Sequence, residues 1–95
     1  MKYLDWSKDK NEILKIERDV SFEDVCNVLE SGGLLDIVAH PNSKKYPNQK
    51  MFVVNISNYV YLIPFVEDEN KIFLKTIIPS RKATKKYLVK GGDNK

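Results

Sequence analysis

Hydrophobic positions in the first third of the chain recur at helical spacing and predict two helices. The first begins at a Ser7 cap and ends near Arg18. The second begins at Ser21, and Asp24 completes an acidic variant of the capping box. The pair Gly32-Gly33 is expected to end this helix, because glycine readily adopts the positive φ of a helix terminus. The apolar sides consist of Ile13, Leu14 and Val20 in the first helix and of Phe22, Val25, Cys26 and Leu29 in the second.

From residue 34 onward, short apolar runs alternate with turn residues, a pattern typical of strands. Four runs are expected to form consecutive strands, at 34–39, 51–56, 59–65 and 71–78. Ser57-Asn58 fits a tight hairpin turn between the second and third of these strands. A brief alternation at 3–6 fits an edge strand ahead of the helices. The last helix is expected from Ser80 to about Val89, followed by a flexible tail at 91–95.

This order of elements predicts an α+β fold in a single domain that spans residues 1–90. The sheet is expected to be antiparallel with four to five strands. Two N-terminal helices and one C-terminal helix are expected to pack on one face of it.

The charges are distributed unevenly along the chain, which has a net charge of +3. Residues 1–36 carry five basic and nine acidic side chains, a balance of −4, whereas residues 37–95 carry eleven basic and four acidic ones, a balance of +7. Such a division predicts one face for an anionic ligand, with nucleic acid as the first candidate, although an ordinary solvated surface would also fit.

Other classes of protein fit the sequence poorly. The single cysteine, Cys26, cannot form an internal disulfide and fits a small core residue. No apolar run approaches the roughly 20 residues of a membrane span, and the first residues are unlike a signal peptide, so a cytoplasmic protein is expected. One histidine and one cysteine without ligand spacing predict no metal site, and no phosphate-loop or dinucleotide glycine pattern predicts a cofactor.

The segment 76–87 is the most informative part of the chain, because an apolar strand breaks at Pro79 and becomes a basic helix. Exposed backbone N–H groups, the helix dipole and cationic side chains all attract phosphate at such a point. Arg81 is the best phosphate clamp, because its planar guanidinium matches two phosphate oxygens. The helix period places Arg81 with Lys85 on one side and Lys82 with Lys86 on another, and these lysines are candidates to hold flanking phosphates.

The long loop 40–49 supplies candidates for proton transfer in metal-free RNA cleavage, which needs a base, an acid and stabilising cations. His40 is one candidate for handling protons, because histidine is the side-chain type best suited to proton transfer near neutral pH, and Tyr46 is the other. Lys45 and Lys50 could hold or polarise the phosphate, while Arg81 would stabilise the transition state.

Structural explanations remain open for the same residues. Arg81 could bridge to an acidic residue of the first helices, His40 could be a strand-end residue, and the last lysines could form a solvated helix face. Tyr46 could equally be a packing residue. A non-catalytic module that binds nucleic acid or a partner through the same basic face is therefore the alternative to an enzyme.

Three segments of the chain resemble the BrnT family of bacterial toxins. They are 5–11 (Asp-Trp-Ser-Lys-Asp-Lys-Asn), 20–25 (Val-Ser-Phe-Glu-Asp-Val) and 77–87, which contains the run Ser80-Arg81-Lys82-Ala83-Thr84. The resemblance implies a RelE-like endoribonuclease that cleaves mRNA and halts translation as the toxin of a type II toxin–antitoxin system. It also implies an antitoxin with a ribbon-helix-helix domain, through which alone the complex would bind promoter DNA.

Arg81, Lys10 and Lys50 occupy positions that match the family pattern, which makes Lys10 a further RNA-binding candidate. The chain departs from the family at 15–19, where a Lys-His-Gly motif is replaced by Lys-Ile-Glu-Arg-Asp. Lys50 also stands where an arginine is expected. The missing histidine favours the non-catalytic alternative.

Overall fold

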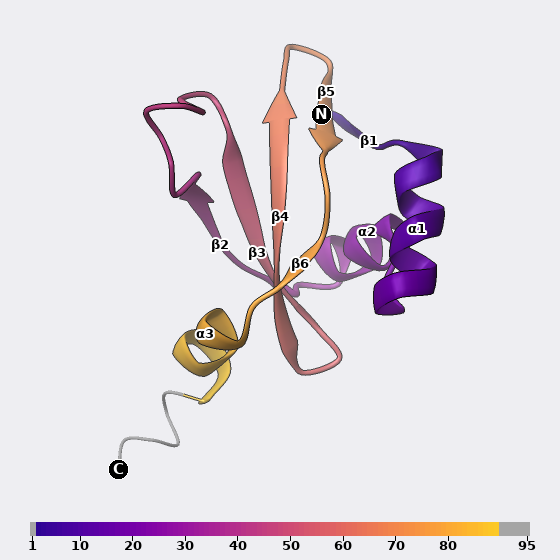
Figure 1. The fold of residues 1–95 in the computed structure, drawn as a ribbon, viewed down its shortest axis with the longest axis vertical. Helices are drawn as coiled ribbons and strands as arrows, with labels where there is room; N and C mark the ends of the chain where they lie inside the picture. Colours follow the sequence, from indigo (N-terminus) through magenta and orange to yellow (C-terminus); the bar gives the residue numbers. More distant parts are fainter. Residues whose placement is uncertain (1, 90–95) are drawn as a thin grey trace.

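The computed structural model describes residues 2–89 and shows an α+β fold with a mixed sheet (Figure 1). The expected tail at 91–95 lies outside the described residues. The elements follow one another as β1 (Tyr3–Asp5), α1 (Lys8–Arg18), α2 (Phe22–Glu30), β2 (Leu34–Ala39), β3 (Lys50–Ile56), β4 (Tyr59–Glu67), β5 (Lys71–Leu74), β6 (Ile78–Pro79) and α3 (Arg81–Thr84). A π-helical segment, Lys85–Val89, continues α3.

Local signals in the sequence fix the helix ends. The Ser7 hydroxyl accepts a hydrogen bond from the Lys10 N–H, which caps α1. Ser21 and Asp24 form the expected capping box, with the Ser21 N–H donating to Asp24 Oδ2 at 2.9 Å and the Asp24 N–H donating to Ser21 Oγ at 3.2 Å. After α2, Gly32 has the predicted positive φ, at 92°.

The sheet has the strand order β1-β5-β4-β3-β2, and β6 pairs with β4. Strands β2 to β5 form the predicted antiparallel meander, and Ser57 and Asn58, with φ of 54° and 66°, make the tight turn between β3 and β4. The expectation of an antiparallel sheet is wrong at β1, which pairs with β5 in parallel. The chain reaches β2 only after passing through α1 and α2, and this long connection leaves β1 at the opposite edge of the sheet.

The strand expected at 71–78 is divided into two short strands. After β5, the Lys75 N–H still donates to the Pro64 carbonyl at 2.8 Å. The chain then continues along β4 to its other end, where Tyr61 pairs with Pro79 in β6. One apolar run therefore supplies two strands, because it extends beyond the point at which the β4–β5 ladder ends.

Helices α1 and α2 cover one face of the sheet (Figure 1). Phe22 stacks on Trp6 with ring centroids 5.6 Å apart. Ile13 is 45% exposed, contrary to the expected apolar side of α1, because Leu14 and the buried polar residue Asn11 face the core instead. The core under these helices consists of Leu14, Val20, Phe22, Val25, Phe52, Val54, Ile56, Ile63, Phe65, Leu74 and Ile77.

The helix α3 lies on the opposite face, so the expectation that all helices share one face is wrong for it. Met51, Val53 and Leu62 line a groove together with residues of α3, and they alternate along their strands with the core residues under α1 and α2. We call the face that carries α3 the open face, because α1 and α2 leave it uncovered. In residues 2–89, no helix has the length and apolar character needed to cross a bilayer.

Candidate nucleic-acid interface

Ser80 and Thr84 fix the start of α3 on the first residues of β4. The Ser80 N–H donates to the Val60 carbonyl at 3.0 Å, and the Val60 N–H donates to Thr84 Oγ1 at 2.9 Å. The Thr84 hydroxyl donates in turn to the Ser80 carbonyl at 2.8 Å. These bonds set the rotation of the helix about its axis, and with it the side chains that face the sheet.

A groove of about 250 Å³ lies between α3 and the open face. Its floor is apolar and comes from three neighbouring strands, β2, β3 and β4. We call it the open-face groove; it is lined by Val38, Met51, Val53 and Leu62 from the sheet and by Ser80, Lys82, Ala83, Lys86 and Tyr87 from the helical segment. Lys82 and Lys86 are one helical turn apart, so two cations border one apolar floor.

Arg81 and Lys85 are exposed and do not line the groove. Within residues 2–89, the Arg81 side chain makes no ion pair or hydrogen bond, so the suggested bridge to the first helices is not formed. The two cationic pairs expected from the helix period are therefore both present, but only one of them lines the groove. Lys82 and Lys86 border the open face, whereas Arg81 and Lys85 point elsewhere.

The start of α3 also offers fewer free donors than the sequence suggested. The Ser80 hydroxyl already accepts a hydrogen bond from the Ala83 N–H at 3.1 Å. The α-helical part spans only Arg81–Thr84 before the π-helical segment begins. A macrodipole needs several aligned peptide units, so the cationic side chains are the stronger attraction for an anion here.

Tyr87 closes one end of the groove through a hydrogen bond to β2. Its hydroxyl donates to Asp36 Oδ2 at 2.8 Å, and the Ile37 N–H donates to Asp36 Oδ1. The bond from Tyr87 is the main cause that lowers the pKa of Asp36, and it likewise raises the pKa of Tyr87. The same hydrogen bond holds the Tyr87 ring in position, with Lys86 Nζ 5.4 Å from the ring centre.

The structure brings His40, Lys45 and Tyr46 together as a loop cluster. The rings of His40 and Tyr46 have centroids 4.6 Å apart, and Lys45 Nζ lies 5.4 Å from the Tyr46 ring centre. The Asn42 N–H donates to His40 Nδ1 at 3.0 Å. Neutral His40 therefore carries its proton on Nε2, and its basic nitrogen is already occupied.

The loop cluster adjoins the open face. The His40 N–H donates to the Gln49 carbonyl at 3.1 Å, so the β2–β3 ladder extends one pair beyond Ala39 and Lys50. His40 follows Val38 by two positions and hence lies on the same face, about 7 Å along β2 from the groove floor.

Lys50 and Lys10 do not belong to this face. Lys50 pairs with Phe65 and alternates with Met51, so its side chain lies on the face covered by α1 and α2. The start of α3 is beside Val60, about 17 Å along β4 from Phe65. Lys10 belongs to α1. The nine predicted site residues therefore do not form one centre.

The open face carries further groups that the sequence analysis missed. Phe73 pairs with Val66, Tyr3 pairs with Lys71, and Lys71 Nζ lies 5.9 Å from the Phe73 ring centre. A hydrogen bond from Lys71 to Asp5 is the main cause that raises the Lys71 pKa. The sequence signal was available at 71–75, where the apolar Ile72 and Leu74 alternate with Lys71, Phe73 and Lys75.

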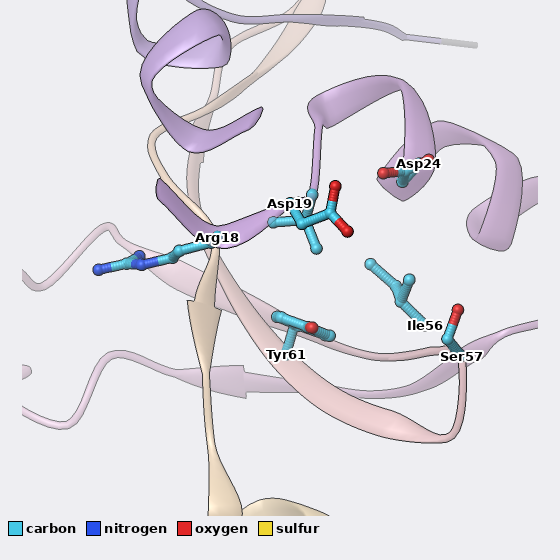
Figure 2. Close-up of a pocket in the computed structure, with 7 residues that line it drawn as sticks. Arg18, Asp19, Asp24, Ile56, Ser57 and Tyr61 are labelled. Carbon is cyan, nitrogen blue, oxygen red and sulfur yellow. The ribbon is translucent and has the colours of Figure 1, made fainter. Parts of the chain in front are cut away.

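A second cleft, of about 480 Å³, lies on the helix side near the β3–β4 turn (Figure 2). Figure 2 shows the side chains of Asp19 and Asp24 beside it, while Arg18 extends away from them. Arg18 instead donates from Nη1 to the Ile77 carbonyl at 2.6 Å. Burial is the main cause that raises the Tyr61 pKa, and the two carboxylates add to it. Two carboxylates and Arg18 line this cleft, which therefore suits an anion less well than the open-face groove with its two lysines.

No protein-family model matches the chain, and comparisons with curated proteins and with solved structures found no match either. The resemblance to the BrnT family rests on the three sequence segments alone.

Proposed function

We propose that this protein binds RNA across the open face of its sheet, with Lys82 and Lys86 as the main phosphate contacts. The observation that carries the proposal is the rotation of α3, which Ser80 and Thr84 fix so that both lysines border the groove. Lys75 extends the same positive face beyond β5, whereas the charge of Lys71 is paired with Asp5 at 3.3 Å. RNA fits such a surface because its backbone offers a phosphate at every nucleotide.

The binding free energy in this proposal is mainly electrostatic. Each lysine that neutralises a phosphate releases a condensed counterion, so affinity falls with salt with a logarithmic slope of about −0.7 per contact to a single strand. An exposed lysine–phosphate pair contributes less than about 1 kcal/mol, so Lys82 and Lys86 together account for roughly a tenfold change in affinity.

The test compares two double variants of one helix by fluorescence anisotropy with a short labelled RNA. Lys82→Ala/Lys86→Ala is expected to weaken binding about tenfold and to reduce the salt slope by about 1.4. Arg81→Ala/Lys85→Ala removes the same charge from the same helix and is the matched control, with a smaller effect on both quantities. Absence of salt-dependent RNA binding, or equal effects of the two variants, would contradict the proposal.

The second candidate function is RNA cleavage, as in a RelE-like toxin, and the loop cluster favours it. His40, Tyr46 and Lys45 lie together beside the same face to which the RNA would bind. For His40 to accept a proton, bound RNA must displace the Asn42 N–H from Nδ1 or turn the ring. Because cleavage needs this additional rearrangement of His40 and binding does not, cleavage is the second candidate.

Incubation of the purified protein with RNA in EDTA separates the two candidates. Cleavage that yields 2′,3′-cyclic ends and is lost in His40→Gln, with binding retained, supports the enzyme. Retention of intact RNA supports binding alone. Cleavage that persists in His40→Gln assigns the proton transfer to another residue.

A toxin would also require a partner antitoxin with a ribbon-helix-helix domain. Co-expression with the product of a neighbouring short reading frame tests this part of the proposal. A stable complex that suppresses growth arrest and binds the promoter supports it, whereas growth arrest that the neighbour does not relieve counts against it.

A further inference from the structure

The floor of the open-face groove is apolar although its border is cationic. Met51 and Val53 are 6% and 1% exposed, while Val38 and Leu62 are only half-buried beneath α3. Phosphate contacts alone do not need such a floor, because the backbone of RNA is polar and charged. The apolar part of the groove therefore calls for an apolar part of the ligand.

The size of the groove restricts that part to a single ring system. Pockets for drug-sized ligands measure roughly 300–1,000 Å³. The open-face groove, at about 250 Å³, is smaller, and α3 closes one side of it. A planar base can lie on the aliphatic floor, whereas a stacked base pair or a peptide helix exceeds the space.

The two lysines complete the match to a nucleotide. Lys82 and Lys86 are four residues apart in the helical segment, and both line the groove. Phosphates on both sides of an inserted base could reach one lysine each. Tyr87, held by Asp36, provides a fixed aromatic edge at one end.

We infer that the open-face groove takes one unstacked base of a single-stranded RNA, with the flanking phosphates on Lys82 and Lys86. This inference rests on the proposed RNA binding and adds to it a requirement for a base that is free to leave its stack. Duplex RNA, whose bases are paired, would then bind only through its phosphates and more weakly.

The first arm of the test fills the groove. Ala83 lines it, and leucine is a comparably good helix former, so Ala83→Leu blocks the space without changing any charge. With an RNA that carries 2-aminopurine at one position, wild-type binding is expected to increase fluorescence as the base unstacks. Ala83→Leu is expected to abolish this increase and to weaken binding by on the order of tenfold, with an unchanged salt slope. Ala83→Ser, which keeps the groove open, is the matched control.

The second arm leaves the protein unaltered, so a folding defect in Ala83→Leu cannot decide the result. An abasic residue is placed at each position of a short RNA in turn. One position at which removal of the base weakens binding about tenfold supports the inference. Salt-dependent binding that is equal for single-stranded, duplex and abasic RNA would overturn the base site and leave the proposed function standing. Absence of RNA binding would overturn both.

Discussion

Asn11 is a buried side chain that joins α1 to the start of α2, and its removal gives a sharp prediction of lost stability. It is 4% exposed; its Oδ1 accepts from the Phe22 N–H at 2.7 Å, and its Nδ2 donates to Glu23 Oε1 at 2.8 Å. In Asn11→Ala, the Phe22 N–H stays buried without this partner. An unpaired buried donor costs about 1–3 kcal/mol, and with loss of the bond to exposed Glu23 we expect a total of about 2–3 kcal/mol.

Trp6 offers a direct assay, because it is the single tryptophan and stacks on Phe22. Urea unfolding followed by its fluorescence should show the loss against a total stability of roughly 5–15 kcal/mol. The melting temperature should fall by about 10–20 °C for a domain of this size. Asn27→Ala, at an exposed site on α2, is the matched control and should stay within about 0.5 kcal/mol of wild type. If Asn11→Ala also lowers the free energy of unfolding by no more than about 0.5 kcal/mol, the reasoning is refuted.

The same contact predicts a dependence on pH. The hydrogen bond from Asn11 is the main cause that lowers the Glu23 pKa. A lowered carboxyl pKa stabilises the fold above the unfolded value, about 4.3, and this contribution is lost as the pH falls through the folded value. The difference between wild type and Asn11→Ala should therefore narrow in acid; a constant difference would exclude the Glu23 part of the argument.

Two further predictions concern the β2 strand and its entrance. Tyr87→Phe removes the hydrogen bond that lowers the Asp36 pKa, so the variant should be less stable than wild type at neutral pH. This difference in the free energy of unfolding should shrink in acid, where Asp36 becomes protonated. Urea unfolding at neutral pH and in acid measures both values. Gly33→Ala places a Cβ 2.9 Å from Val28 Cβ and 3.2 Å from the Asn55 carbonyl oxygen, and should cost about 1–3 kcal/mol. In Gly32→Ala, the added Cβ has no atom within 4 Å, and the cost is the backbone strain of the positive φ of +92°, about 1 kcal/mol. A lower melting temperature for Gly32→Ala than for Gly33→Ala would contradict this account.

The helix ends and the hairpin turn were predictable because each depends on residues that are neighbours in the chain. The Ser21–Asp24 capping box and the Ser57-Asn58 turn need no partner from elsewhere. The direction of β1 was not predictable in this way. It depends on how far α1 and α2 carry the chain across the sheet, which hydrophobic periodicity does not encode.

For the candidate site, the helix period gave the two cationic pairs on the last helix but could not choose between them. The choice follows from the hydrogen bonds that join Ser80 and Thr84 to Val60, a residue of β4 that lies far from α3 in the sequence. The same limit explains why Arg81 and Lys50 were expected in one centre. The type of a residue indicates which chemistry is possible, but it does not predict the distance between two residues that are far apart in the chain.

The sequence by itself determined the order of the main helices and strands, the capped starts of the helices and the separation of an acidic first third from a basic remainder. Only the tertiary structure decided that β1 is parallel, that α3 crosses the open face, and that Lys82 and Lys86 border an apolar groove. The physical reason is that local propensities act within a few residues, whereas the pairing of strands and the rotation of α3 are set by contacts that form only when the chain folds.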